Sequence, residues 1–193
     1  CRDWSSDVCS SDLVEQISEE AALSRTIAAV RNKLSTPDRA TFEQAVVEFK
    51  AYQLAEMNRA SDAVIPGTLS GLAGAGQAAF ARENFTKLLA EMSVPGKLEP
   101  ATSEAYREAD SHLWQVYHRD LTLKVKERRR VDSEYGWVIA DYEKAARESQ
   151  HHWVRLGDLL AKLAASLYRN KAKGFDPAVA MKFALIKTRL AEL

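Results

Sequence analysis

The placement of proline is the feature of this sequence that most constrains its fold. The 193-residue chain contains five prolines, Pro37, Pro66, Pro95, Pro100 and Pro177, and long stretches without proline separate them. Proline is costly inside a helix but tolerated in its first turn. Apolar residues between the prolines recur at spacings of three and four, and no stretch alternates at the period of a strand. The sequence therefore predicts an all-α bundle of about six helices.

The predicted helices cover about 14–34, 36–62, 71–92, 102–131, 133–171 and 176–193. Residues 64–70, which contain Pro66 and Gly67, and residues 170–175, which contain Gly174, read as loops, and residues 93–101 read as a linker. Apolar residues from 138 to 167 follow a nearly heptad spacing, which is typical of a helix packed lengthwise on others.

The two halves of the chain resemble each other, which predicts two loosely repeated three-helix units, 14–92 and 102–193. Each half reads as a helix, a long helix with an aromatic residue, a loop with glycine and proline, and a closing helix. Duplication of one unit is a reasonable hypothesis for such a pattern. The sequence leaves open whether the units form one elongated body or two closely packed domains.

The first thirteen residues do not read as part of the fold. Residues 3 to 13 match one translated frame of a common sequencing-library adapter, and the segment 1–13 holds both cysteines, Cys1 and Cys9. We expect this segment to be an artefact, so the true N-terminus and any secretion signal lie outside the sequence.

Charge and hydropathy exclude two classes of partner. The chain has 27 basic and 27 acidic residues, a balance that gives no strong attraction to nucleic acid or an anionic membrane. A basic run at 124–130 ends a predicted helix, where cations complement the helix dipole, and it has no interleaved aromatic residues. No apolar run approaches the ~18 residues of a spanning helix. We expect no nucleic-acid partner and no transmembrane segment.

Two patterns that suggest a bound cofactor or metal have simpler interpretations. Gly71, Gly74 and Gly76 resemble a dinucleotide fingerprint, but that motif needs a preceding strand, so close helix packing is the better explanation. Glu148 and His152 have the spacing of two metal ligands, whereas zinc sites need about three or four, which favours an interfacial histidine. No nucleophile elbow, phosphate loop or carboxylate pair is visible. We expect no catalytic residue, no cofactor and no metal.

Residues 108–117 resemble the start of the lysozyme-inhibitor LprI-type N-terminal domain, whose pattern is Asp-x-x-Leu-Asn-x-x-Tyr. Asp110, Leu113 and Tyr117 match this pattern, and Trp114 stands where the family has asparagine. The resemblance covers about 106–193 and, more faintly, 14–92.

A second signature of that family, Trp-x-x-Tyr-Arg-Asp, is similar to the segment that begins at Trp153. Trp153 and Asp158 match, and Leu156 and Gly157 stand in place of the tyrosine and arginine. The end of the chain, from Arg189, is similar to the family's closing Arg-x-x-Glu-Leu.

The resemblance implies a non-enzymatic protein of the bacterial envelope or periplasm that binds a protein partner, a lysozyme, and inhibits it by steric occlusion. A cytoplasmic location is the alternative. We expect the motif residues to be structural, with Leu113, Tyr117 and Trp153 packed together as core. Asp158 would pair with an arginine or cap a neighbouring backbone.

The second functional hypothesis is a helical scaffold that mediates protein contacts or associates with itself along the apolar stripe at 138–167. The sequence leaves the oligomeric state open. Binding residues tend to lie on loops that a rigid scaffold holds. The predicted partner-binding loop residues are Ile65, Gly67, Thr68, Lys171, Lys173 and Phe175.

Overall fold

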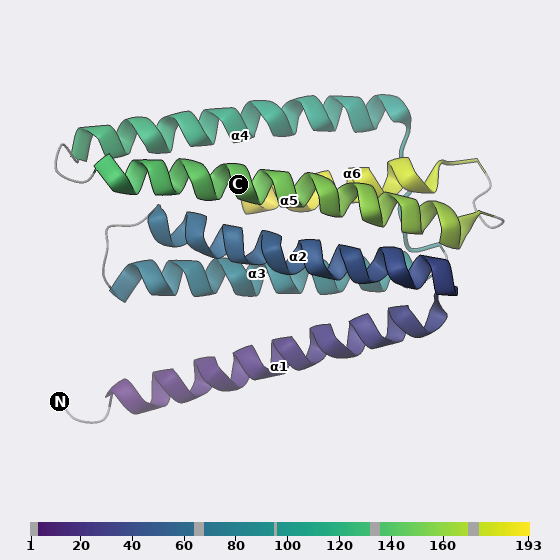
Figure 1. Cartoon of the computed structure of the whole chain (residues 1–193), viewed down its shortest axis with the longest axis horizontal. Coiled ribbons are helices and arrows are strands. Elements are labelled where there is room, and N and C mark those ends of the chain that lie inside the picture. The colour runs from purple at the N-terminus through teal and green to yellow at the C-terminus, as the bar shows by residue number, and fades with distance from the viewer. Residues whose placement is uncertain (1–3, 64–67, 95, 132–135, 170–173) are drawn as a thin grey trace.

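The chain folds into a bundle of helices (Figure 1). The computed structural model describes residues 4–63, 68–94, 96–131, 136–169 and 174–193, and these contain six helices and no strand. The predicted all-α fold is confirmed. No helix in these described ranges is both long and apolar enough to cross a membrane. The helices are α1 (Trp4–Lys33), α2 (Thr36–Asp62), α3 (Thr68–Ser93), α4 (Ser103–Val131), α5 (Gly136–Tyr168) and α6 (Pro177–Glu192).

Side-chain caps mark the starts of α2 and α6. Ser35 accepts a hydrogen bond from the main-chain N–H of Asp38 at the start of α2, and a proline occupies the first turn of that helix. Asp176 caps α6 in the same way through its carboxylate, which accepts from the N–H groups of Ala178 and Val179. These bonds satisfy N–H groups that have no partner within the helix.

Three helix boundaries differ from the prediction. α1 begins at Trp4, not near residue 14, because no glycine or proline interrupts the stretch between them. α3 begins at Thr68, so residues 68–70 are helical and not loop. α5 ends at Tyr168, where the tyrosine hydroxyl donates to the main-chain oxygen of Val94 at 2.9 Å.

The helices are arranged around a central pair, α2 and α5, which make the most extensive contact in the molecule. Asp38 near the start of α2 bonds Ser166 near the end of α5, whereas Glu56 near the end of α2 bonds Ser149 farther back on α5. The pair is therefore antiparallel (Figure 1). In the first half of the chain, α3 packs on α2 and α1 packs on α3. In the second half, α6 packs on α5 and α4 packs on α6.

One hydrophobic core runs through both halves. The rings of Phe49 and Phe85 stack at its centre, with their centroids 3.9 Å apart. Most of the predicted stripe of α5 is buried in the bundle, so that stripe is not a surface for a second copy of the chain. Leu72 of α3 lies outside this core and is exposed. The core includes Val30, Leu34, Phe42, Phe49, Phe85, Leu89, Met92, Leu156, Leu160, Leu163, Met181 and Leu185.

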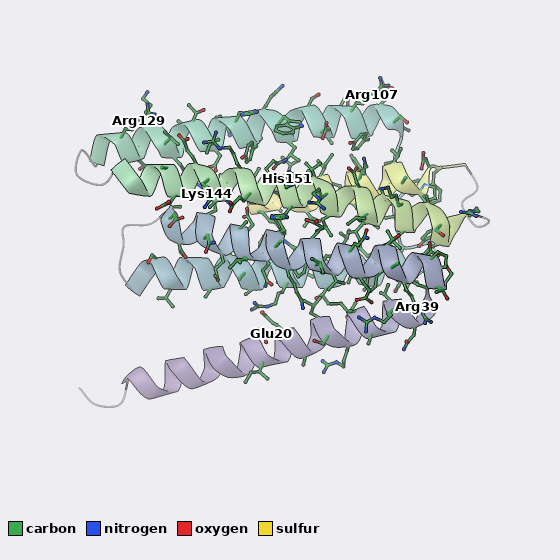
Figure 2. All side chains as sticks on the ribbon, viewed as in Figure 1. Glu20, Arg39, Arg107, Arg129, Lys144 and His151 are labelled. Atoms are coloured by element: carbon green, nitrogen blue, oxygen red, sulfur yellow. The ribbon has the colours of Figure 1, made fainter. Side chains whose placement is uncertain are left out.

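Charged side chains cover the outside of the bundle, and Lys126 and Arg129 of the basic run at the end of α4 are exposed. The six side chains labelled in Figure 2 come from α1, α2, α4 and α5, and all of them are exposed. Arg129 is exposed in the last turn of α4, as expected of a solvated helix end. The labelled residues are Glu20, Arg39, Arg107, Arg129, Lys144 and His151.

Gly74 allows α3 to approach α2 closely, which confirms the packing interpretation for one of the three glycines. A methyl group at Gly74 would lie 2.9 Å from the main-chain oxygen of Met57 and would also overlap the side chain of Ser61. We expect Gly74→Ala to lower the free energy of unfolding by about 1–3 kcal/mol, because the helices must move apart. Chemical denaturation followed by circular dichroism measures this loss.

Gly76→Ala is the matched control, because a methyl group there meets nothing within 4 Å. Alanine is the better helix former, so this variant should gain about 0.5–1 kcal/mol. Equal effects of the two substitutions would contradict close packing at Gly74.

Candidate functional site

Arg189 is the centre of a buried polar network that joins α2, α5 and α6. The side chain is fully buried. One guanidinium nitrogen donates to Glu56 and to the hydroxyl of Ser149, both at 2.9 Å. The other donates to the hydroxyl of Tyr52 at 2.7 Å and to Glu192 at 3.1 Å. The closing Arg-x-x-Glu pattern of the sequence thus places both of its charged residues in this network.

Glu56 is the most heavily bonded acid of the network. Arg59 donates to it at 2.7 Å and Gln77 at 3.2 Å, in addition to Arg189 and Ser149. Burial alone would raise the pKa of Glu56, but Arg189 and Arg59 together hold this pKa well below its usual range. Burial raises the pKa of Tyr52, and the nearby glutamates add to that shift while Arg189 opposes it.

The buried network is structural. Two arginines and two glutamates balance in charge, and every carboxylate accepts from a cation. Of its members, Tyr52 and Glu192 border a crevice of only about 20 Å³, which has room for no more than a small solvent molecule. Such a network fixes the register of the helices and offers no space for a ligand.

A groove on the surface between α4, α5 and α6 is the better candidate for binding. We call it the aromatic groove, because three of its lining residues are aromatic. Its volume is about 220 Å³. It is lined by Tyr106, Asp110 and Trp114 of α4, Trp153, Val154, Gly157 and Asp158 of α5, and Lys182, Leu185 and Ile186 of α6.

Helical spacing brings the α4 residues to the groove, since Tyr106, Asp110 and Trp114 are four residues apart and share one face. The indole of Trp114 packs against two neighbouring rings. It stacks on the His118 ring, with centroids 5.5 Å apart, and contacts the Tyr117 ring edge-on, with centroids 6.0 Å apart. Trp114 nevertheless remains 40% exposed. A large apolar ring is therefore presented to solvent in a fixed orientation.

The charges of the aromatic groove do not balance. Lys182 donates to Asp158 at 2.7 Å, and this hydrogen bond raises the pKa of the lysine. Asp110 forms neither a hydrogen bond nor an ion pair with any residue that the structure describes. Burial raises the pKa of Tyr106, and the Asp110 carboxylate beside it raises that pKa further, while Lys182 opposes the shift.

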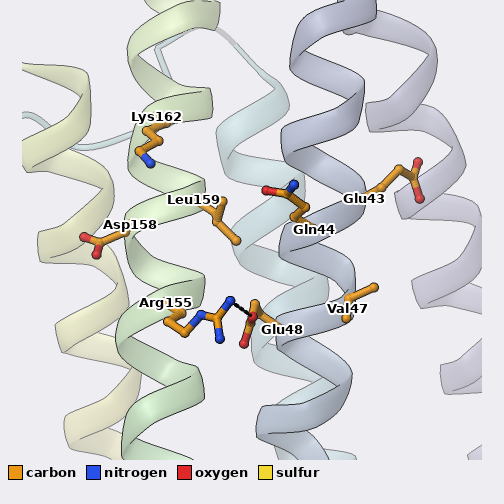
Figure 3. Close-up of a pocket in the computed structure, with 8 residues that line it drawn as sticks. All are labelled: Glu43, Gln44, Val47, Glu48, Arg155, Asp158, Leu159 and Lys162. Atoms are coloured by element: carbon orange, nitrogen blue, oxygen red, sulfur yellow. Dashed lines mark ion pairs between the residues drawn. The ribbon is translucent and has the colours of Figure 1, made fainter.

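A second, wider groove of about 640 Å³ lies on the surface where α2 and α5 pack together. Figure 3 shows Glu48 and Arg155 pointing toward each other across it, at 2.9 Å. Glu48 also contacts His152 at 2.8 Å, and Glu43 pairs with Arg31 on α1. Because these acidic and basic side chains are already paired with one another, this groove is the weaker candidate for a charged ligand.

His152 lies at the interface between α2 and α5, as the interfacial interpretation predicts. Its ring faces Glu48, and Glu148 is exposed and lies near Lys144 at 4.0 Å. Within the described ranges, no three side chains of the kinds that bind metals come together.

The family-motif residues divide between the groove and the interior. Asp110, Trp153 and Asp158 line the aromatic groove. Leu113 and Tyr117 are buried, but Trp153 is only partly buried and packs against the main core, of which those two are not members. The prediction that these three form one core cluster is therefore wrong.

The prediction that Asp158 pairs with an arginine or caps a backbone is also wrong. Asp158 accepts a hydrogen bond from Lys182 of α6 at 2.7 Å, and among the described residues it neither pairs with an arginine nor caps a backbone. The arginine of that motif set, Arg189, lies in the buried network instead.

The predicted binding loops receive little support. Thr68 lies in the first turn of α3, and Phe175 is partly buried against the core and meets Tyr168 edge-on at 6.5 Å. The helix ends that flank the two loops lie at opposite ends of the bundle (Figure 1). The other four residues, Ile65, Gly67, Lys171 and Lys173, lie outside the described residues.

Sequence reasoning did not identify the aromatic groove. The spacing of Tyr106, Asp110 and Trp114 was visible in the sequence, but it does not show which face of α4 is open. The groove exists because three helices from one half of the chain converge there. No protein-family model, no curated protein and no solved structure matches this chain.

Proposed function

We propose that this chain is a non-enzymatic protein-binding module that engages its partner through the aromatic groove. The observation that carries the proposal is the exposed indole of Trp114 beside the carboxylate of Asp110, which forms no ion pair within the described part of the chain. Tryptophan and tyrosine dominate the binding energy of protein interfaces, because they bury a large area at a small cost in conformational entropy.

The resemblance to LprI-type domains supports a lysozyme as the partner and the bacterial envelope as the location. Three of the positions that match the family pattern, Asp110, Trp153 and Asp158, line the groove. Two positions that depart from the pattern, Trp114 and Gly157, line it as well. Inhibition would then be steric, with the rim of the groove seated over the substrate cleft of the lysozyme.

Trp114→Ala should weaken binding to such a partner by about thirtyfold, the effect of losing an interface hot spot. Calorimetric titration of residues 14–193 and of the full chain against lysozymes of several classes measures the affinity, and a cell-wall lysis assay measures inhibition. Leu123→Ala is the control, because Leu123 lies on the same helix, is 57% exposed and does not line the groove.

Two outcomes would reject the proposal. One is the absence of binding to every lysozyme tested. The other is binding that Trp114→Ala and Leu123→Ala weaken equally, because the groove would then not be the contact surface.

Self-association is the second candidate function, and a separate surface favours it. Leu72 and Phe80 of α3 are both exposed apolar residues and lie outside the aromatic groove. Sedimentation over a range of protein concentrations distinguishes the two functions: a stable dimer that Leu72→Ser and Phe80→Ser disperse would favour a scaffold over a lysozyme-binding module.

A further inference from the structure

We infer that the aromatic groove receives a cationic side chain of the partner, an arginine, stacked on Trp114 and paired with Asp110. This inference rests on the proposed function and names the chemistry that the groove recognises. It follows from the charges, the aromatic lining and the size of the groove.

The aromatic groove is lined by more acidic than basic groups. The groove contains two carboxylates, Asp110 and Asp158, and one ammonium group, that of Lys182. Lys182 donates its hydrogen bond to Asp158, so the excess negative charge resides on Asp110. The raised pKa of Tyr106, to which burial and then Asp110 contribute, agrees with an excess of negative charge there. A cation is the complementary ligand.

The aromatic lining selects among cations. Three aromatic rings, those of Trp114, Trp153 and Tyr106, line the groove, and the faces of aromatic rings attract cations. A guanidinium group is planar, so it can stack on an indole while its N–H groups bond a carboxylate in two places. The ammonium group of lysine cannot do both. Arginine therefore fits the groove better than lysine does.

The size of the groove limits the ligand to one side chain. Its volume of about 220 Å³ lies below the ~300–1,000 Å³ of a site for a drug-sized ligand. Gly157 contributes to the open floor, because it has no side chain and the nearest atom to an added methyl group would be Leu185 at 3.6 Å. A single long side chain can enter here, whereas a folded segment cannot.

The test compares two peptides that differ only in charge. Acetyl-Gly-Arg-Gly-amide and the same peptide with citrulline in place of arginine have nearly the same shape, but citrulline is neutral. The full chain carries ¹⁵N-labelled tryptophan, and the indole N–H signals of Trp114 and Trp153 are followed during titration. We expect the arginine peptide to shift both signals and to bind about five- to thirtyfold more tightly than the citrulline peptide.

Asp110→Asn should remove this preference, so that both peptides bind equally. Glu108→Gln is the matched control, because Glu108 is an exposed acid on the same helix outside the groove, and it should keep the preference. Circular dichroism verifies that both variants are folded.

Three results would overturn the inference: no shift of either indole signal at millimolar peptide, equal binding of the two peptides to the unmodified chain, or an undiminished preference in Asp110→Asn. None of these would reject the proposed function, which fails only if lysozyme binding is absent or independent of Trp114.

Discussion

Glu56→Ala is expected to lower the free energy of unfolding by about 3–5 kcal/mol, as removal of one member of a buried ion pair does. Glu56 is fully buried and accepts bonds from Arg59, Arg189, Ser149 and Gln77. Its removal leaves Arg189, which is also fully buried, with only Glu192 as a counter-charge. A desolvated cation with too few partners is the main source of the loss.

Glu43→Ala is the control, because Glu43 is also a glutamate of α2 that pairs with an arginine, but its pair with Arg31 is exposed to solvent. Exposed pairs contribute about 0–1 kcal/mol. Denaturation in urea, monitored by circular dichroism, measures both variants under the same conditions. A loss for Glu56→Ala as small as that for Glu43→Ala would show that the buried network contributes no net stability.

The pH dependence of the free energy of unfolding gives a second measurement of the contribution of Glu56 to stability. The folded-state pKa of Glu56 lies below its ordinary value of 4.5, because Arg189 and Arg59 outweigh the effect of burial. A lowered pKa means that its contribution to stability is complete above about pH 4.5 and is lost as the pH falls toward the folded-state value. The difference in stability between the unmodified chain and Glu56→Gln should therefore shrink as the solution is acidified from pH 6 to pH 3.

The helical bundle could be predicted from the sequence because its signals are local. Proline positions, the caps at Ser35 and Asp176, and the apolar spacing on α2 each act within a few residues. Burial of Phe42 and Phe49 follows directly from that spacing. The start of α1 was not predicted correctly, because residues 4–13 contain no glycine or proline that would mark a helix boundary near residue 14.

The buried network was not predictable, because its charged members look like surface residues. Arg189 and Glu56 are 133 positions apart, and each is a residue type that is normally exposed. Only the convergence of α2, α5 and α6 places them together. The aromatic groove depends on three helices in the same manner, because its lining residues come from α4, α5 and α6.

The sequence predicts two similar halves, but it does not predict how extensive the contact between α2 and α5 is. The polar bonds between α2 and α5, such as Glu48 with His152 and Asp38 with Ser166, join residues that no local pattern relates. This contact bears on how the chain unfolds, and a substitution in the core can measure it.

Phe49→Ala should lower the free energy of unfolding by about 3–5 kcal/mol, because the change removes a buried ring and leaves a cavity. Phe49 is 2% exposed and stacks on Phe85 within a core shared by both halves. Leu54→Ala is the control on the same helix, since Leu54 is 55% exposed and should change stability by less than about 0.5 kcal/mol.

The position of the tryptophans makes this substitution a test of whether the halves unfold together. Three of the four tryptophans, at 114, 137 and 153, lie in the second half, and Trp4→Phe removes the fourth. In that background, fluorescence reports on the second half, whereas circular dichroism reports on all helices. Because the core is continuous, Phe49→Ala in the first half should shift both transitions equally. A fluorescence transition that does not move would show that the two halves fold independently, since the lost ring would then affect only its own half.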